Sequence, residues 1–290
     1  MTDRPILCLG ETLWDVLPSG EFLGGAPLNV SAHVTKLGMP AVMISRVGAD
    51  DRGRRTLDRL KALHLRTDRV QIDPVLPTGE ARATLKADGA AEYTFTHPAA
   101  WDAIALTSHD QELAQHSSAV VFGTLAQRTE VSRQTIYQLV DSASWRILDV
   151  NLRAPHDDLS LLMESLTRAD FVKVNETELA ILADALAVDA QPESVRAKLF
   201  QRFGTGSLCI TLGAEGALLY HDGGWVEQAA FPTQVADTVG AGDSFLARLL
   251  VGLLHGQSPA KAMQQAARLA AFVASQHGAI PDYDGQDFAG

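Results

Sequence analysis

The sequence predicts an α/β fold with a mainly parallel central sheet flanked by helices, and three observations support this. Short apolar runs alternate with helix-length amphipathic stretches along most of the chain, which is typical of βαβ units. One segment instead alternates residue by residue, as a β-hairpin does. The chain has 290 residues, 46% of them hydrophobic, enough for one large core. Because no repeat or linker divides it, we expect a single domain over residues 1–290.

The elements follow one another in β-α order from the start of the chain. A strand is expected at Ile6–Gly10, a helix at Pro27–Leu37, a strand at Ala41–Val47 and a helix at Asp51–His64. Later apolar runs predict strands at Ser118–Phe122, Arg146–Val150, Phe171–Val174 and Leu208–Leu212. The later helices are expected at Glu130–Asp141, Leu159–Arg168, Glu176–Leu182, Glu193–Phe203, Ala241–His255 and Pro259–His277. Parallel strands bring their carboxyl ends to one edge, where ligands bind in such sheets.

The segment that departs from the β-α order runs from Thr78 to His97, around a turn at Asp88-Gly89. Its alternation places two sets on opposite faces, Arg82, Thr84 and Lys86 against Ala83, Leu85 and Ala87. We expect residues 11–24 and 73–101 to form a small projecting β-sheet inserted in the domain, with Leu13–Leu23 joining the hairpin. Such a sheet beside a site can act as a lid that excludes water. The alternatives are an edge decoration and a dimer contact.

Charge and targeting signals narrow the class of protein. The 24 Lys and Arg against 35 Asp and Glu give a net charge of −11, which argues against a general nucleic-acid or anionic-membrane surface. The first residues lack a signal pattern and no run of about 18 apolar residues occurs, so we expect a cytoplasmic protein. Cys8 and Cys209 lie in apolar runs and are expected to be free and buried.

The stretch D-T-V-G-A-G-D-S-F, residues 237–245, puts Asp243 between a glycine turn and an apolar helical pattern. A helix N-terminus offers N–H groups without intrahelical partners and a partial positive charge, which attract phosphate. Asp243 can cap this helix, or it can face a phosphate and handle a proton beside it.

Three other motifs follow strands or glycine turns. Asp15 in G-E-T-L-W-D and Asn29 in G-G-A-P-L-N suit sugar hydroxyls, although a solvated acid and a helix-start residue explain them as well. Asn175 and Glu178 in N-E-T-E fit either a capping box or a hydrated Mg²⁺. The turn L-G-A-E-G, residues 212–216, leaves room for a flat ring or is simply a turn.

With these motifs in this order, the chain resembles the ribokinase-like (PfkB) family of small-molecule kinases over nearly its whole length. G-G-A-P-L-N-V-S, followed by Gly38 and Gly48, matches one family signature, and D-T-V-G-A-G-D matches the second. The resemblance implies a ribokinase-like three-layer fold with a β-sheet lid. One departure is Arg248, which stands where the second signature usually has Gly or Ala; it should change helix packing without removing the anion hole.

The resemblance implies transfer of the γ-phosphoryl group of ATP to a hydroxyl. Asp243 would take the proton of that hydroxyl, and the turn of Gly240, Ala241 and Gly242 would supply an anion hole. The implied ATP-binding residues are Lys173, Asn175, Thr211, Gly213, Gly216, Gly240, Gly242 and Ser275. The implied cofactors are ATP and Mg²⁺, the metal held through water by Glu178 and Asn175, with K⁺ near Asp237 as a further expectation.

The resemblance also implies a small sugar as substrate. G-E-T-L-W-D, S-R-V-G, D-V-N-L-R and A-A-W-D are similar to the fructokinase branch, so fructose is preferred. The implied sugar-binding residues are Asp15, Gly24, Gly25, Asn29, Arg153 and Trp101. If Arg153 faces a substrate carboxylate instead of the transferred phosphate, 2-dehydro-3-deoxygluconate fits better. Kinases for other hexoses or nucleosides, a sensor without catalysis and a homodimer through the lid stay open.

Overall fold

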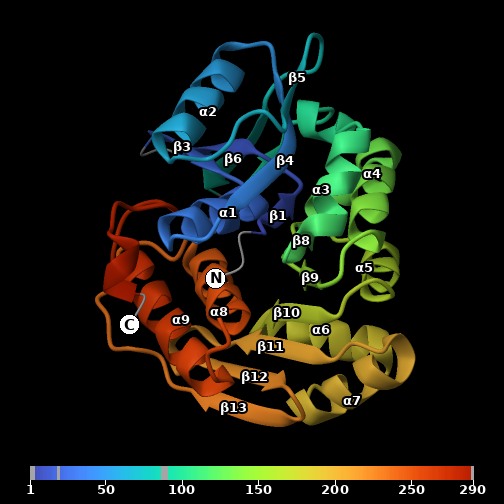
Figure 1. Cartoon of the computed structure of the whole chain (residues 1–290), viewed down its shortest axis with the longest axis vertical. Coiled ribbons are helices and arrows are strands. Elements are labelled where there is room, and N and C mark those ends of the chain that lie inside the picture. The colour runs from blue at the N-terminus through green and yellow to red at the C-terminus, as the bar shows by residue number, and fades with distance from the viewer. Residues whose placement is uncertain (1–3, 18–19, 86–90, 289–290) are drawn as a thin grey trace.

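The computed structural model describes residues 4–17, 20–85 and 91–288. Within them the central sheet has nine strands in the order β13-β12-β11-β10-β9-β8-β1-β4-β5. Their bounds are β1 Ile6–Leu9, β4 Ala41–Gly48, β5 Val70–Asp73, β8 Ala119–Gly123, β9 Arg146–Asp149, β10 Phe171–Asn175, β11 Ser207–Thr211, β12 Ala217–His221 and β13 Gly224–Gln228. Along this order, all neighbouring strands between β11 and β5 pair in parallel. The strands β12 and β13 add an antiparallel hairpin at one edge (Figure 1).

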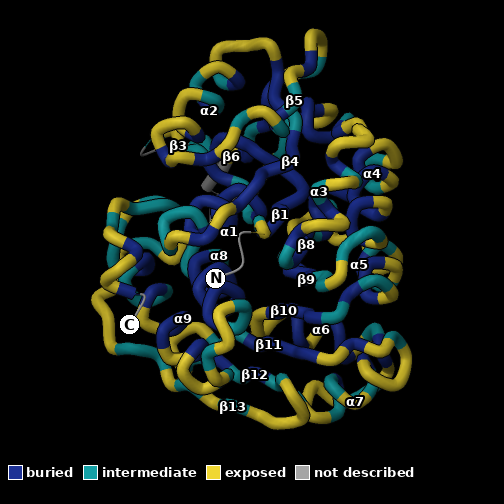
Figure 2. Tube along the Cα trace, in the orientation of Figure 1, coloured by how far each residue is buried: buried dark blue, intermediate teal, exposed yellow. Residues whose placement is uncertain are grey.

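Helices cover both faces of the central sheet and make three layers. One face carries α1 Ala26–Lys36, α2 Asp51–Ala62, α8 Ala241–Leu254 and α9 Pro259–Ala274. The other carries α3 Ser108–His116, α4 Glu130–Asp141, α5 Leu159–Leu166, α6 Glu176–Leu186 and α7 Pro192–Phe203. Alternate residues of β1 face opposite sides of the sheet. Leu7 packs in the core beneath α3 to α7, and Cys8 packs in the core beneath α1, α2, α8 and α9. Figure 2 shows the central strands buried between these layers.

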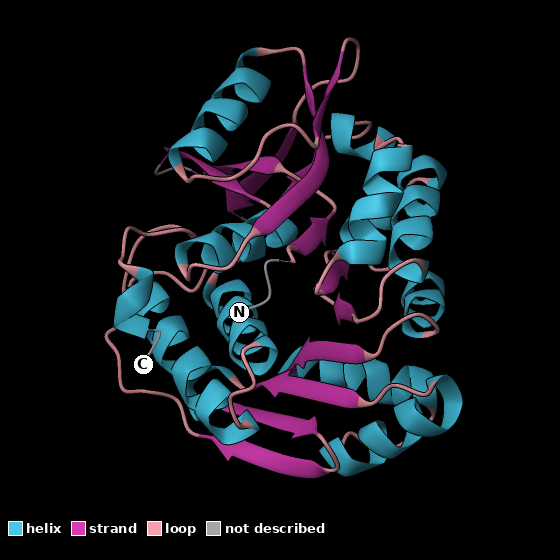
Figure 3. Ribbon diagram, in the orientation of Figure 1, coloured by secondary structure: helices cyan, strands magenta, loops and turns pink. Residues whose placement is uncertain are grey.

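A second sheet, here called the projecting sheet, contains β3-β2-β6-β7. The bounds are β2 Leu13–Leu17, β3 Gly20–Gly24, β6 Gly79–Leu85 and β7 Ala91–Phe95. The pairs β2–β3 and β6–β7 are antiparallel, and β2–β6 is parallel. Figure 3 shows these strands apart from the central sheet and beside α2. The predicted projecting sheet and its junction with Leu13–Leu23 are thus confirmed, while the Asp88-Gly89 turn lies outside the described residues.

Most predicted elements are confirmed, and the differences have local causes. The expected helix at the end of the chain stops at Ala274 rather than His277, because Ser275 caps it. The helix after Asn175 continues to Leu186 and ends at Ala187 in the left-handed conformation. The polar helix α3 and the edge strands β5 and β13 were not predicted, and β12 was given no bounds. Among the described residues no helix combines the length and apolar character needed to cross a membrane.

Candidate active site

Asp243 lies in the first turn of α8 and contacts the start of α1. The Asn29 side chain, which is 4% exposed, donates from Nδ2 to Asp243 Oδ2 at 2.8 Å. Burial raises the pKa of Asp243 to about 6, and the nearby Asp149 acts in the same direction, against Lys173 and the Asn29 hydrogen bond. The carboxyl is partly exposed, so it can meet a ligand. The structure therefore joins two motifs that are more than 200 residues apart.

The turn before α8 fixes the position of this acid. Gly240 has φ 78°, and a Cβ there would lie 2.6 Å from the Ala279 backbone, so glycine is required. The Ala241 N–H donates to the Thr238 carbonyl at 3.3 Å. The N–H groups of Gly242 and Asp243 lie in the first turn of the helix, where intrahelical acceptors are lacking. The sequence predicts an anion hole at this turn with Ala241 among its residues, and the structure leaves the N–H groups of Gly242 and Asp243, rather than that of Ala241, for such a role.

Two more carboxyls lie on the same side of the site. Glu11 directly follows β1, is 2% exposed and accepts the Ala26 N–H at 3.2 Å. Burial raises the pKa of Glu11 to about 7 and that of Asp15 to about 6; Arg153 opposes the shift in both, and Asp243 adds to it. Glu11 Oε2 has no hydrogen-bond partner among the described residues.

The two glycines of G-G-A-P-L-N make room for these acids. A Cβ on Gly24 would lie 2.3 Å from Asp15 Oδ2, and one on Gly25 would lie 2.4 Å from the Glu11 carbonyl. Gly25 also has φ 116°, which disfavours other residues. Their absent side chains thus allow the acid-bearing segment after β1 to approach the start of α1.

Arg153 and Trp101 are placed differently. Arg153 is exposed on the loop after β9, donates to the Leu152 carbonyl at 2.9 Å and lies near enough to Glu11, Asp15 and Asp243 to lower their pKa values. Trp101, expected to close over the sugar, is 1% exposed, so in this structure it offers almost no surface to a ligand. This expectation needs correction: Trp101 packs in the core cluster that contains Leu13 and Ala81 of the projecting sheet.

Lys173 forms a buried ion pair across neighbouring strands. Its Nζ lies 2.8 Å from Asp149 Oδ1, and the two residues are register partners in β10 and β9. Burial alone would lower the Lys173 pKa, but Asp149, Asp243 and Glu178 raise it above its usual value. A Cβ on Gly242 would lie 3.5 Å from Nζ, so the ammonium group sits beside the anion-binding turn. Asp149 Oδ2 lacks a hydrogen-bond partner in the described part of the chain.

Asn175 and Glu178 form a capping box, one of the two interpretations of N-E-T-E. Asn175 Oδ1 accepts the Glu178 N–H, and Glu178 Oε2 accepts the Asn175 N–H, both at 2.9 Å. Glu178 Oε1 also accepts the Leu152 N–H at 2.8 Å. Burial and the nearby Asp149 raise the Glu178 pKa. The cap leaves Glu178 beside the Lys173–Asp149 pair.

The residues expected around the nucleotide meet along one edge. Thr211 ends β11 and pairs in register with Asn175, while a Cβ on Gly213 would meet open space. Gly216 is also required for packing, because a Cβ there would lie 2.0 Å from the Gln228 carbonyl. The Ala274 carbonyl, next to Ser275, accepts the Asp237 N–H at 3.2 Å. Asp237, beside which K⁺ is expected, therefore lies next to the C-terminal end of α9.

Arg248 is 2% exposed and points away from the anion-binding turn. Its Nε donates to the Phe288 carbonyl at 2.7 Å and its Nη2 to Gln257 Oε1 at 3.3 Å. Burial lowers its pKa to about 10. Arg248 thus joins α8 to the C-terminal segment, away from the turn of residues 240–243, and its effect relative to the usual Gly or Ala stays a prediction.

Sequence reasoning missed Glu11 and Asp149, although both lie in stretches that it used. A signal was present: each is an acid at the carboxyl end of an apolar strand, where ligands bind. For Asp149 the matching charge on the neighbouring strand, Lys173, was a second signal.

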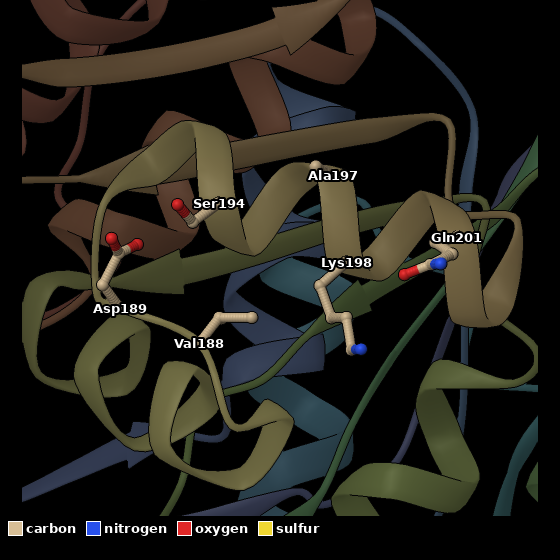
Figure 4. Close-up of a pocket in the computed structure, with 6 residues that line it drawn as sticks. All are labelled: Val188, Asp189, Ser194, Ala197, Lys198 and Gln201. Atoms are coloured by element: carbon tan, nitrogen blue, oxygen red, sulfur yellow. The ribbon is translucent and has the colours of Figure 1, made fainter.

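A shallow depression lies elsewhere, between the end of α6 and α7 (Figure 4). Its lining residues are Val188, Asp189, Ser194, Ala197, Lys198 and Gln201. None of them belongs to the motifs described above. The motif residues lie instead at the carboxyl edge of the central sheet, away from this depression.

Comparison with known proteins agrees with this geometry. A family model described as pfkB family carbohydrate kinase matches residues 19–284. A fructokinase of Klebsiella pneumoniae is 30% identical over 266 residues, covering 87% of this chain and 85% of its own. The structure of the sugar kinase PH1459 of Pyrococcus horikoshii in complex with ATP is 27% identical with a TM-score of 0.83, covering 97% and 96% of the chains. The ATP-bound fructokinase of Xylella fastidiosa, 24% identical with a TM-score of 0.82 over 97% and 94%, shares the fold.

Proposed function

Since this chain belongs to the pfkB family of carbohydrate kinases, and is therefore a phosphotransferase with a sugar hydroxyl as acceptor, we propose that its acceptor is fructose. The single observation that carries the choice of a neutral sugar is the charge of the acceptor side. The acceptor side contains Glu11, Asp15 and Asp243. Among the described residues, Arg153 is the cation that lowers the pKa of all three. The similarity to a fructokinase supports fructose among neutral sugars.

The charge balance disfavours an acidic acceptor. A substrate carboxylate would meet up to three carboxyls and one guanidinium, and like charges in a poorly hydrated site repel strongly. A neutral polyol instead offers hydroxyl donors to the same carboxyls. Glu11 Oε2 and Asn29 Oδ1, both without partners within the described residues, are acceptors that such donors can satisfy. In this proposal Arg153 faces the transferred phosphate.

Asp243 is the proposed base. Its carboxylate would accept the proton of the acceptor hydroxyl as the phosphoryl group moves, and a pKa of about 6 leaves it mostly ionised at neutral pH. The Asn29 side chain fixes the carboxylate through the 2.8 Å hydrogen bond to Oδ2. The N–H groups of Gly242 and Asp243 would bind the phosphoryl oxygens, with Lys173 supplying positive charge behind them.

The donor set near Lys173 fits a hydrated Mg²⁺ that accompanies ATP. Asp149 Oδ2 is a buried carboxylate oxygen without a partner among the described residues, and the Glu178 carboxylate lies nearby. Hard oxygen donors that leave most waters in place suit this ion. Mg²⁺ would neutralise phosphate charge, and these two residues would hold its waters. Asn175 and Glu178 both accept backbone N–H groups in the cap. The Glu178 carboxylate keeps a negative charge and further acceptor capacity, so we assign the water contact to Glu178 and none to the neutral Asn175 oxygen. K⁺ beside Asp237 remains part of the proposal.

An ADP-coupled assay with a panel of acceptors tests the proposal. We expect turnover with D-fructose to exceed that with 2-dehydro-3-deoxygluconate, ribose and adenosine, in Mg²⁺ with and without K⁺. Arg153→Met should lower kcat for every accepted sugar if the guanidinium faces phosphate. Arg202→Met, a change at an exposed arginine on α7, is the matched control. A preference for the keto acid that Arg153→Met abolishes would overturn the fructose assignment and place Arg153 on a substrate carboxylate.

A further inference from the structure

Arg128 occupies a buried junction that the proposed chemistry does not use. It follows the short 3₁₀ helix η2 (Leu125–Gln127) after β8, and its side chain is 5% exposed. Nε and Nη2 donate to the two oxygens of Asp102 at 2.8 and 2.7 Å. The guanidinium carbon lies 3.8 Å from the centre of the Trp101 ring. This bidentate, stacked geometry requires a planar guanidinium, which lysine does not provide.

The same side chain holds the point where the projecting sheet returns to the main domain. Nη2 also donates to the carbonyl of Thr96, the residue directly after β7, at 2.5 Å. Beyond it, the segment carrying Trp101 and Asp102 is fixed to the start of α4. The Thr129 hydroxyl donates to the Asp102 carbonyl at 2.5 Å, and the Ser132 hydroxyl to the Trp101 carbonyl at 2.7 Å. Arg128 therefore fixes the first residue after β7, where the chain returns to the main domain.

Arg128 also contacts the loop that carries Arg153. Its Nη1 lies 3.0 Å from His156 Nε2, and the His156 N–H donates to the Arg153 carbonyl at 2.7 Å. The His156 ring packs edge-on against Phe95, the last residue of β7, with 5.8 Å between ring centres. One guanidinium thus touches both the hinge of the projecting sheet and the turn that presents Arg153.

We propose that Arg128 is a positioning residue that couples the hinge of the projecting sheet to the Arg153 loop, so that closure of the sheet over the acceptor and placement of the Arg153 guanidinium occur together. The inference rests on the proposed sugar kinase function. Arg128 reaches the acceptor only through these contacts, so its loss acts through Arg153 and the sheet. Networks of this kind modulate coupling by about 2- to 30-fold.

The contact with His156 makes the coupling sensitive to pH. Since arginine only donates, His156 Nε2 must be the unprotonated acceptor. Burial lowers the pKa of His156, and Arg128 and His97 lower it further, while Asp102 and Asp157 oppose them. Protonation of His156 would place two cations in contact and break the link. The coupling should therefore be intact at neutral pH and be lost as pH falls through the depressed pKa.

The test compares Arg128→Lys, His156→Gln and His156→Leu with a matched control, Arg133→Lys. Arg133 lies nearby in α4 and pairs with Glu130, without contact to the projecting sheet. Arg128→Lys should raise the KM for the sugar about tenfold while the KM for ATP changes less than about twofold. His156→Leu should act similarly but more weakly. His156→Gln keeps an acceptor that does not titrate, so it should leave the neutral value of the sugar KM unchanged and reduce its acidic rise. The part of the rise that comes from protonation of Glu11, Asp15 and Asp243 should persist in this variant.

Hydrogen exchange of the β7 amides supplies a readout that needs no substrate. We expect faster exchange at β7 in Arg128→Lys and in no other strand, with the control matching the wild type. Equal loss of affinity for ATP and sugar, or an unchanged exchange rate at β7, would overturn the coupling. If the wild type turns over no sugar, the proposed function fails while the exchange experiment still decides the role of Arg128 at the hinge.

Discussion

The two sides of the candidate active site carry buried charge in opposite ways. On the nucleotide side Lys173 and Asp149 form an ion pair at 2.8 Å, so each charge is compensated by the protein itself. On the acceptor side Glu11, Asp15 and Asp243 form no ion pair with a cation of the described residues, and burial raises the pKa of each. The proposed nucleotide side therefore holds a compensated ion pair before any ligand binds, whereas the carboxyls of the proposed acceptor side have no such partner among the described residues.

This difference has a physical reason. A phosphate brings its own negative charge, so the side that receives it needs a fixed cation, and a buried cation needs a partner to remain charged. A sugar brings hydroxyl donors without charge, so the side that receives it needs free acceptors. Carboxyls without partners are costly in the absence of ligand, and this cost is relieved when the hydroxyls bind. The four predictions below test this contrast.

Asp243→Asn should have the largest effect. The amide keeps the shape of the carboxyl but does not accept the proton, so we expect kcat to fall about 10³-fold, ~4 kcal/mol in the barrier. In the wild type the base must be ionised, so kcat should rise with pH through about 6 and then level. A coupled ADP assay from pH 5 to 8 measures both effects. A variant that keeps a tenth of the wild-type rate would assign Asp243 to helix capping instead.

Lys173→Met should have the next largest effect, on stability. It leaves Asp149, which is 4% exposed, as a buried charge without its partner, at a cost of roughly 3 kcal/mol in the free energy of unfolding. The double variant Lys173→Met/Asp149→Leu removes both charges and should recover at least half of the loss. Urea unfolding of the three proteins measures this.

Nucleotide affinity separates the structural from the functional part of this ion pair. The double variant should recover stability without recovering ATP affinity, because the cation beside Gly242 is still missing. If the double variant is as unstable as the single one, the pair is not the self-compensated unit that the comparison assumes.

Glu11→Gln probes the acceptor side through the pH dependence of stability. Burial raises the Glu11 pKa from 4.5 to about 7, so between these values the folded state binds the proton more tightly than the unfolded chain. Wild-type stability should therefore fall as pH rises from 4.5 to 7. Glu11→Gln should lack this pH dependence. The free energy of unfolding of the variant minus that of the wild type should therefore be about 2 kcal/mol larger at pH 8 than at pH 5. Chemical denaturation at the two pH values tests it.

Saturating fructose provides the control for that experiment. Hydroxyl donors stabilise the ionised carboxyls, so fructose should reduce the wild-type pH dependence and have a smaller effect in Glu11→Gln. An equal pH dependence in the two proteins without sugar would show that Glu11 is ionised or solvated in the folded state, against the comparison.

Most of the fold could be predicted from sequence, because apolar periodicity reports burial directly. The helix Glu130–Asp141 is confirmed at both ends. The helix α3 has only nine residues, few of them apolar, and the edge strand β5 has four, so neither gives a clear pattern. Gly240 and Asp243 could be found because their spacing is local. The Arg128 junction could not, since it joins residues from three loops, and Trp101 looked exposed because sequence does not show which side of a loop is covered.

Arg248→Met is expected to have the smallest effect and sharpens the comparison with a third case. Arg248 is a buried cation with no acidic partner among the described residues, and burial lowers its pKa to about 10. Its contacts are the Phe288 carbonyl and Gln257, and not residues of the candidate active site. Replacing such a charge by a hydrophobic side chain of similar length should raise the free energy of unfolding by ~1 kcal/mol. Because no ligand meets this cation, kcat should stay within about twofold. Urea unfolding and the coupled assay measure the two quantities. A tenfold loss of kcat would mean that packing around Arg248 affects the position of Asp243 through α8. In that case an unpaired buried charge outside the candidate active site would also contribute to catalysis.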